Sequence, residues 1–147
     1  MTGRKVMDRE EAKVGFFTWL YSPKDTTFER SIYNRGSVLD KFYADGCITN
    51  PFNRRICIEE RRALSYLVQS TTNDLTMDRA VAISKAREGR TSYVSHLMHD
   101  EVVIDFSDED RDLLPELKTI FASTKLGNFM TNITAGKNYL EMSDLNI

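Results

Sequence analysis

Two short runs in which apolar and polar residues alternate, 93–98 and 102–106, flank the triplet His99, Asp100 and Glu101. β-branched and aromatic residues dominate both runs, which is typical of half-buried strands joined by a tight reversal. The pattern predicts an antiparallel β-hairpin whose tip carries two carboxylates.

Helical spacing accounts for most of the remaining apolar residues. Apolar positions three and four apart predict helices, in chain order, at 8–21, 37–44, 59–88 and 113–125. Asp8 is suited to cap the first helix, and Gly89 to end the third, which is the longest. Because helices and short strands are mixed along the chain, the predicted fold class is α+β.

The segments between the helices carry turn signals. Residues 47–58 are predicted to form two strands around an Asn-Pro-Phe-Asn turn, and the polar stretch 24–36 a connecting loop. Alternation from Phe129 onward predicts another strand. Cys47 and Cys57 could face each other across the first of these hairpins, and in a chain without an export signal we expect free thiols.

Composition limits the class of protein. The chain has 147 residues, of which 41% are hydrophobic, so it fits one globular domain or a substantial piece of a larger one. It has no apolar run near the roughly 18 residues of a membrane helix and no apolar N-terminal signal segment. We therefore expect a soluble, cytoplasmic protein.

The net charge of −2 argues against general adhesion to nucleic acid, but the charges are unevenly distributed. Residues 1–62 hold 12 Lys and Arg against 9 Asp and Glu, whereas residues 63–147 hold 8 against 13. The first part is thus better suited to phosphate contacts, and the second to metal-binding acids.

Four residues of the first helix, Arg9, Lys13, Phe17 and Tyr21, are spaced four apart and therefore share one stripe of its surface. Cations along a helix suit a triphosphate, and aromatic rings further along suit a sugar and a base. The alternative is that Phe17 and Tyr21 belong to the core while Arg9 and Lys13 are solvated.

The longest helix has a polar stripe of its own, in which Arg61, Ser65 and Gln69 lie four apart. Such a stripe can follow a nucleic-acid strand, and a glutamine amide can both donate to and accept from a base edge. Arg54 and Arg55, after the predicted turn, could contact a phosphate backbone. The alternative for the helical stripe is an ordinary exposed face.

The triplet at the hairpin tip suggests a divalent-cation site, because Mg²⁺ prefers oxygen ligands and a hairpin fixes their direction. The acids can instead serve the turn alone, since Asp bonds its own backbone there. A further hypothesis, a small metal-dependent hydrolase built on the triplet and His96, lacks a convincing metal shell.

Three segments in this order, REEAKVGFFTWLY, ERRALSYLVQSTTNDL and YVSHLMHDEVVIDF, closely resemble the C-terminal half of the polymerase region of family A DNA polymerases. The first is similar to the family's nucleotide-binding fingers helix, the second to its long palm helix, and the third to its HDE motif. The closing GKNYLEM is similar to phage members. The resemblance covers nearly the whole chain and implies a fingers portion at 1–46 and a palm portion at 47–147.

The resemblance implies roles for the first helix. Arg9 and Lys13 would contact the triphosphate of an incoming deoxynucleotide, and Lys13 would also assist the leaving pyrophosphate. Phe17 would pack on the sugar and base. Tyr21 would guard the pocket of the template base.

It also implies a metal site and a DNA contact. Asp100 would ligate the catalytic Mg²⁺ ions, two in the complete enzyme, with His99 and Glu101 beside the primer end. Arg61 and Gln69 would contact primer–template DNA near its minor groove. The residues predicted to contact DNA are Arg54, Arg61, Ser65, Gln69 and His99, although the family commonly has Asn where Ser65 stands.

Two-metal phosphoryl transfer needs carboxylates near both ions, and the family takes one from an upstream motif of D-Y-S-x-I/Q-E-x-R type. Nothing in this chain resembles that motif, and Asp105 would lie away from the hairpin tip. The hypothesis is therefore a split or truncated DNA polymerase, inactive alone, which needs a second polypeptide carrying the remaining palm and thumb.

Apolar surface and an unpaired sheet edge are expected where that second chain docks. The enzyme would act in the cytoplasm, in a phage-infected bacterium if its origin is a phage. The alternative is a non-catalytic DNA-binding or regulatory remnant of such a polymerase.

Overall fold

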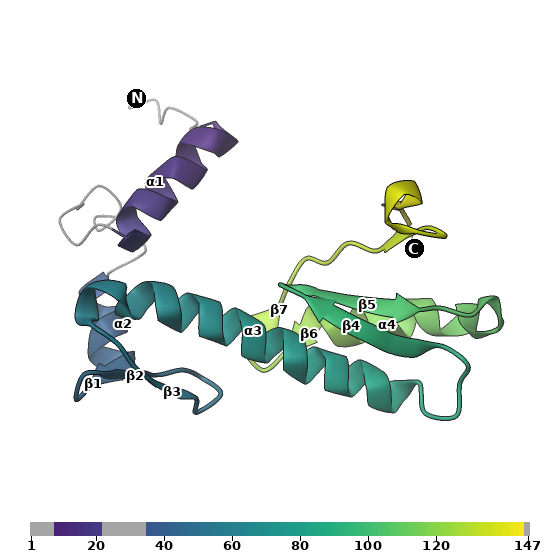
Figure 1. Cartoon of the computed structure of the whole chain (residues 1–147), viewed down its shortest axis with the longest axis horizontal. Coiled ribbons are helices and arrows are strands. Elements are labelled where there is room, and N and C mark those ends of the chain that lie inside the picture. The colour runs from purple at the N-terminus through teal and green to yellow at the C-terminus, as the bar shows by residue number, and fades with distance from the viewer. Residues whose placement is uncertain (1–7, 22–34, 146–147) are drawn as a thin grey trace, which may run out of the picture. The chain divides into compact units, whose positions relative to one another are not determined.

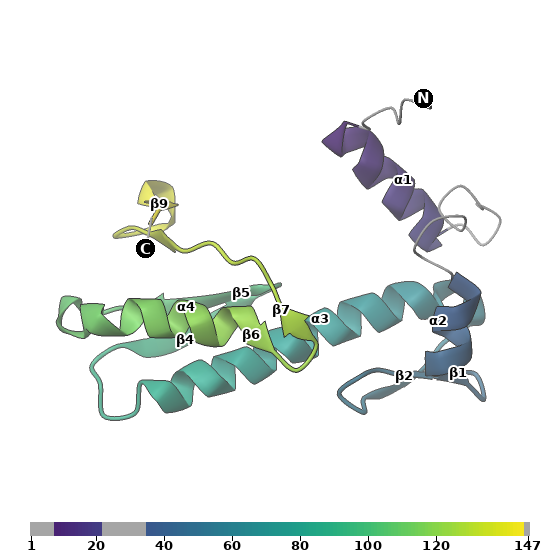
Figure 2. The same ribbon diagram turned by 180° about the vertical axis from the view of Figure 1, so that it is seen from behind.

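The computed structural model describes residues 8–21 and 35–145 and gives them a mixed α+β architecture (Figures 1 and 2). The chain divides into two compact units, residues 1–71 and 72–147, and one long helix contributes to both. The predicted α+β class is confirmed, and the predicted boundary between fingers and palm portions at residue 46 stays a prediction. Each described helix lacks an apolar stretch long enough to cross a membrane.

Unit 1 contains two short helices, a small sheet and the start of the long helix α3. Its strands pair antiparallel in the order β1-β2-β3. The elements are α1 (Arg9–Tyr21), α2 (Arg35–Phe42), β1 (Tyr43–Ala44), β2 (Cys47–Thr49), β3 (Arg55–Cys57) and α3 (Glu60–Ala86). The predicted helices at 8–21 and 59–88 are confirmed, and the helix predicted at 37–44 is found at 35–42, because Tyr43 and Ala44 form β1 instead. The loop predicted at 24–36 lies outside the described residues except for its last two, which begin α2.

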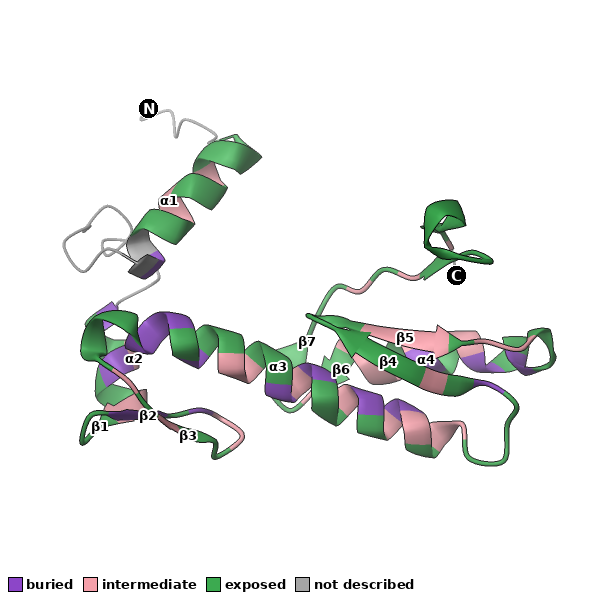
Figure 3. Ribbon diagram, in the orientation of Figure 1, coloured by how far each residue is buried: buried purple, intermediate pink, exposed green. Residues whose placement is uncertain are grey.

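The core of unit 1 forms where the apolar faces of its helices meet β2. Ile48 is fully buried, and Leu64 and Leu67 of α3 pack around it with Leu39 of α2 and Leu20 of α1. Removing an isoleucine side chain of this size from water contributes about 1.5–3 kcal/mol. Figure 3 shows the corresponding buried positions along the first turns of α3.

The expectation of free thiols is wrong, because Cys47 and Cys57 form a disulfide between β2 and β3. The two residues lie directly opposite each other in the antiparallel register. Ile58 N donates to Gly46 O in the neighbouring pair at 3.0 Å, so the cysteines occupy a non-hydrogen-bonded position, where facing side chains approach most closely. The strand register thus brings the two cysteines together, whereas the expectation of free thiols rested only on the lack of an export signal.

Unit 2 contains the rest of α3 and several antiparallel strand pairs. The predicted helix at 113–125 is confirmed over nine residues of α4, which a 3₁₀ helix precedes. The elements after α3 are β4 (Tyr93–Met98), β5 (Glu101–Asp105), η1 (Asp108–Leu113), α4 (Leu114–Ala122), β6 (Ser123–Thr124), β7 (Gly127–Asn128), β8 (Thr134–Ala135), η2 (Tyr139–Glu141) and β9 (Ser143–Asp144).

Two glycines of unit 2 stand at positions where the backbone disfavours other residues. Gly89 has φ +79°, a left-handed conformation that follows the end of α3 and suits glycine. Gly136 approaches Glu141 so closely that a Cβ would lie 2.6 Å from its carbonyl oxygen. Of the strand predicted from Phe129 onward, Thr134–Ala135 pairs with β9, so that prediction holds for two residues.

The core of unit 2 lies between α3, α4 and the β4–β5 hairpin. Ile83 of α3 packs with Leu113 and Leu117, and Val102 and Ile104 of β5 cover them. Both views of the ribbon show α4 against one face of the hairpin (Figures 1 and 2).

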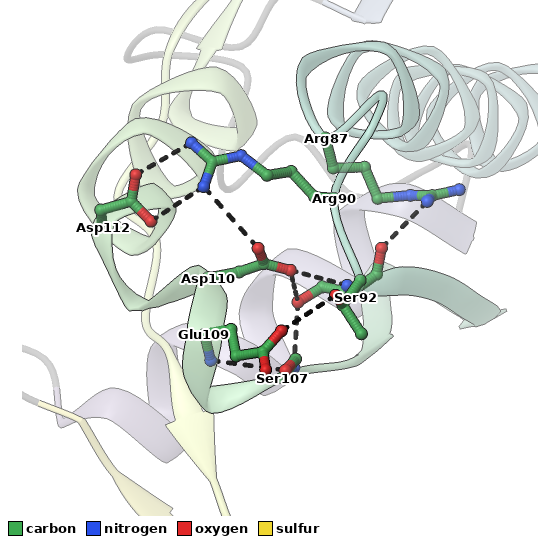
Figure 4. Close-up of polar contacts among 8 residues, drawn as sticks. Arg87, Arg90, Ser92, Ser107, Glu109, Asp110 and Asp112 are labelled. Atoms are coloured by element: carbon green, nitrogen blue, oxygen red, sulfur yellow. Dashed lines mark hydrogen bonds and ion pairs between the residues drawn. The ribbon is translucent and has the colours of Figure 1, made fainter.

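A buried carboxylate joins the end of α3, the start of β4 and η1 (Figure 4). Asp110 is 3% exposed, and its Oδ2 accepts hydrogen bonds from both the backbone N and the Oγ of Ser92, each at 2.7 Å. Ser107 N donates to the same Ser92 Oγ at 2.9 Å. Arg90 lies 3.7 Å from the other Asp110 oxygen and also binds Asp112 through two hydrogen bonds.

These hydrogen bonds lower the pKa of Asp110, since the Ser92 hydroxyl and then the Ser92 amide favour the ionised carboxylate more than burial disfavours it. A pKa below the ordinary value of 3.8 means that the folded state prefers the ionised form. The resulting stability is therefore fully present above pH 3.8 and is lost as the pH falls through the lower folded-state pKa.

We predict that Asp110→Asn lowers the melting temperature at pH 7 by on the order of 5–10 °C, because it removes the charge that Ser92 and Arg90 satisfy. Below pH 4 the difference from wild type narrows. Asp108→Asn is the matched control, since Asp108 pairs with Arg111 in an exposed position. Thermal unfolding followed by circular dichroism measures both variants, and equal effects would contradict the account.

Candidate functional site

The predicted hairpin with the HDE triplet at its tip is confirmed. β4 and β5 pair antiparallel, and Met98 lies opposite Glu101, so His99 and Asp100 form a two-residue connection. All three residues of the triplet are exposed. The hairpin thus presents two adjacent carboxylates at one end of unit 2.

A β-bulge at Ser95 decides which side chains face the core. Val94 pairs with Ile104, but the next pair joins His96 to Val103, so Ser95 is the extra residue. The shift places Val94, three residues before Leu97, on the same face as Leu97. Simple alternation would put Val94 and Leu97 on opposite faces. The other face of the hairpin carries Glu101 with His96.

The tip has an unusual backbone. His99 has φ +55°, in the region that non-glycine residues seldom adopt. Two-residue hairpin turns require such a conformation and usually place Gly, Asn or Asp there. A histidine at this position carries a conformational cost, and residues of this kind concentrate at functional sites.

The other acid of the hairpin lies away from the tip, as predicted. Asp105 pairs with Tyr93 at the open end of the hairpin, about 13 Å from Glu101 along the strand. Its Oδ2 accepts a hydrogen bond from Tyr93 Oη at 2.8 Å, which raises the pKa of that phenol. Asp105 is therefore engaged in a structural pair.

The part of the chain that the structure describes does not provide a complete set of magnesium ligands. No three His, Cys, Asp or Glu residues there lie close enough together to hold a metal ion. Asp100 and Glu101 offer neighbouring carboxylates without a third ligand from elsewhere in these residues. We therefore derive no catalytic step from a metal held by this chain alone.

The predicted stripe of α1 lies in unit 1. Arg9, Lys13 and Phe17 are exposed, and Phe17 keeps 45% of its surface accessible. The core residues of this helix are Phe16 and Leu20, so the alternative that Phe17 belongs to the core is wrong. The backbone of Tyr21 ends the helix, and its side chain lies outside the described residues.

The stripe predicted on α3 is exposed only in part. Arg61 is exposed, and its Nε lies 2.7 Å from Glu59, which lowers the pKa of that carboxyl. Ser65 is 4% exposed, and its hydroxyl accepts a hydrogen bond from Gln69 Nε2 at 3.4 Å. Gln69 is exposed, so Ser65 supports the Gln69 amide from beneath.

The turn that carries Arg54 and Arg55 is held by Asn50, which the sequence had not singled out as a functional residue. Asn50 is 2% exposed, and its Oδ1 accepts from Phe52 N and Arg54 N at 2.9 and 3.0 Å. Its Nδ2 donates to Ser70 of α3 at 3.3 Å. Both arginines are exposed beside this fixed turn.

Arg35 is a second residue that the sequence did not identify. It is 7% exposed and donates to Leu20 O near the end of α1 at 3.2 Å and to Arg61 O at 3.1 Å. It therefore joins the end of the predicted nucleotide helix to the start of α3. Its position within a polar, aperiodic segment concealed this role.

The C-terminal turn touches the hairpin through one aromatic residue. Tyr139 Oη lies 2.7 Å from His96 Nε2, and the two rings are tilted at 52°. Asn138 caps the short η2 helix by accepting from Leu140 N at 3.0 Å. The GKNYLEM segment thus forms a closed turn beside the exposed face of the hairpin.

Comparison with known proteins gives one informative similarity. Over 84 residues, 55% of this chain, the sequence is 32% identical to the DNA polymerase of Mycobacterium phage D29. The chain spans about an eighth of that relative's length, because the match covers 12% of it. No family model matches the chain, and no solved structure matches it.

The strained tip generates a prediction. His99→Gly retains or raises the free energy of unfolding, whereas His99→Val lowers it by about 1–2 kcal/mol, because a β-branched residue resists positive φ. Met98→Val in the adjacent strand is the control and changes stability little. Urea denaturation measures all three, and a His99→Val chain as stable as His99→Gly would contradict the turn geometry.

Proposed function

We propose that this chain is a C-terminal part of a template-directed DNA polymerase that adds nucleotides to a primer 3′-hydroxyl. The observation that carries the proposal is the hairpin tip, where a strained two-residue turn exposes Asp100 beside Glu101, the first residue of β5. The similarity to a phage DNA polymerase supports the same reaction class.

In this proposal α1 binds the incoming deoxynucleoside triphosphate. Arg9 and Lys13 are exposed one helical turn apart and would neutralise phosphate oxygens, while the exposed Phe17 ring would pack on the sugar and base. Lys13 would also donate positive charge to the leaving pyrophosphate. Arg35 would hold α1 in place by binding the carbonyl of Leu20 near its end.

At the other end of the reaction, Asp100 would ligate catalytic Mg²⁺, with His99 and Glu101 beside the primer end. Magnesium ions in such an enzyme lower the charge on the reacting phosphate and hold the attacking and leaving oxygens. Because the described residues of this chain supply only part of the ligand set, a second polypeptide would contribute the other carboxylate.

A shallow groove of about 580 Å³ in unit 2 offers a surface for that polypeptide. Met77 and Val81, one turn apart on α3, line it with Val94 and Leu97 of β4. Met77, Val81 and Leu97 keep 47%, 55% and 39% of their surfaces exposed. Since Ile83 on another face of α3 is buried, this part of the helix is apolar on two sides, which is typical of a helix between two layers.

The rival function is a DNA-binding or regulatory remnant without catalysis. The retained Arg9, Lys13 and Phe17 stripe favours the polymerase, because a module that binds only DNA has no need of a triphosphate site. DNA binding alone cannot separate the two, but turnover can.

The test is primer extension with Mg²⁺ and all four deoxynucleotides. We expect no extension by the 147-residue chain alone and extension after it is combined with a chain from the same genome that carries the missing acid motif. Robust extension by the isolated chain would disprove the split arrangement. Stable DNA binding without extension in the combined sample would favour the remnant.

In the combined enzyme, Asp100→Ala should lower turnover by on the order of 10³-fold, since a lost metal ligand costs several kcal/mol of transition-state stabilisation. Asp105→Asn is the matched control, because it removes the same charge from the far end of the hairpin. Size-exclusion chromatography checks that both variants still assemble. Near-normal turnover of Asp100→Ala would remove this residue from the metal site.

A further inference from the structure

The solvent-facing side of α3 in unit 1 carries an exposed set of residues beside the predicted stripe. Arg62, Tyr66 and Gln69 are spaced four and three apart, so they lie on one face of the helix. All three are exposed, and Tyr66 keeps 38% of its surface accessible. The buried residues Ala63, Leu64 and Leu67 mark the opposite side.

The predicted stripe and this face differ in whether their polar groups already bind other residues of unit 1. Arg61 already binds Glu59 through its Nε, and Ser65 is buried beneath Gln69. Arg62 makes no such side-chain hydrogen bond among the described residues, although its charge also helps to lower the pKa of Glu59. The charge available to a ligand at the start of α3 is therefore centred on Arg62.

The surroundings favour an anionic ligand. Glu59 and Glu60 stand just before this stretch, but from Arg61 to residue 73 the sequence contains no Asp or Glu, which is about 20 Å of helix without a negative side chain. An arginine binds phosphate oxygens through paired N–H groups, and a tyrosine ring packs on a base or deoxyribose.

Resting on the proposed function, we infer that Arg62 and Tyr66 form a further DNA contact, with Arg62 on a backbone phosphate and Tyr66 against the adjoining sugar or base. Gln69, supported by Ser65, completes this face and reaches a base edge. The DNA strand then follows Arg62, Tyr66 and Gln69, rather than the Arg61, Ser65 and Gln69 line that spacing predicts.

The test measures, by fluorescence anisotropy, how tightly a fluorescein-labelled primer–template duplex binds to the full chain. The salt concentration is varied from about 50 to about 200 mM, because affinity that depends on phosphate contacts falls over this range. Arg62→Gln should weaken binding about 3–10-fold and reduce the salt slope by about one. Tyr66→Leu should weaken binding about 3–10-fold, whereas Tyr66→Phe, which keeps the ring, should stay within about 2-fold. Circular dichroism verifies that each variant is folded.

Arg111→Gln is the charge-matched control, since Arg111 is an exposed arginine on η1 in unit 2. If Arg111→Gln weakens binding as much as Arg62→Gln, the effect is one of general charge and the inference is wrong. If Arg61→Gln and Gln69→Ala weaken binding while Arg62 and Tyr66 variants do not, the inference fails and the proposed function stands. If the wild-type chain does not bind the duplex at about 50 mM salt, the inference is also wrong. Primer extension then tests the proposed function separately.

Discussion

The buried Asp110 carboxylate is the interaction on which the second unit depends. Three elements meet at it, because Ser92 at the start of β4 donates twice to it and Ser107, before η1, donates to Ser92. A buried charge is tolerated only when its hydrogen-bonding capacity is met, and Arg90 adds the opposite charge. The direction in which the β4–β5 hairpin leaves α3, and hence the position of its tip within this unit, follows from this cluster (Figure 4).

Local patterns were sufficient to predict the long helix, the hairpin and its tip. Helical spacing and a glycine stop define α3 over 27 residues, and alternation defines β4 and β5. Features that depend on distant contacts were not predictable in the same way. The Ser95 bulge, which places Val94 on the same face as Leu97, has no signal in the alternation. Spacing predicted that Cys47 and Cys57 could face each other, but the expectation of free thiols missed the disulfide between them.

The residues of the candidate site likewise divide into those that spacing predicted and those that it did not. Spacing identified Arg9, Lys13 and Phe17 as one exposed stripe, and the structure agrees on their exposure. Spacing could not show that Ser65 would be buried, because a small hydroxyl residue four positions from Gln69 can lie beneath the longer side chain. Nor could it find Arg35, whose role comes from the distant carbonyls of Leu20 and Arg61, or Asn50, which binds two amides of its own turn and also Ser70 of α3.

The central claim is that the tip of the hairpin supplies one part of a metal site. The most direct measurement is a Mn²⁺ titration of the ¹⁵N-labelled chain, since bound Mn²⁺ broadens nearby amide signals. The account predicts broadening confined to His99, Asp100 and Glu101 and their neighbours, with affinity on the order of millimolar for the isolated chain. Micromolar binding by the isolated chain, or no broadening at the tip, would contradict it.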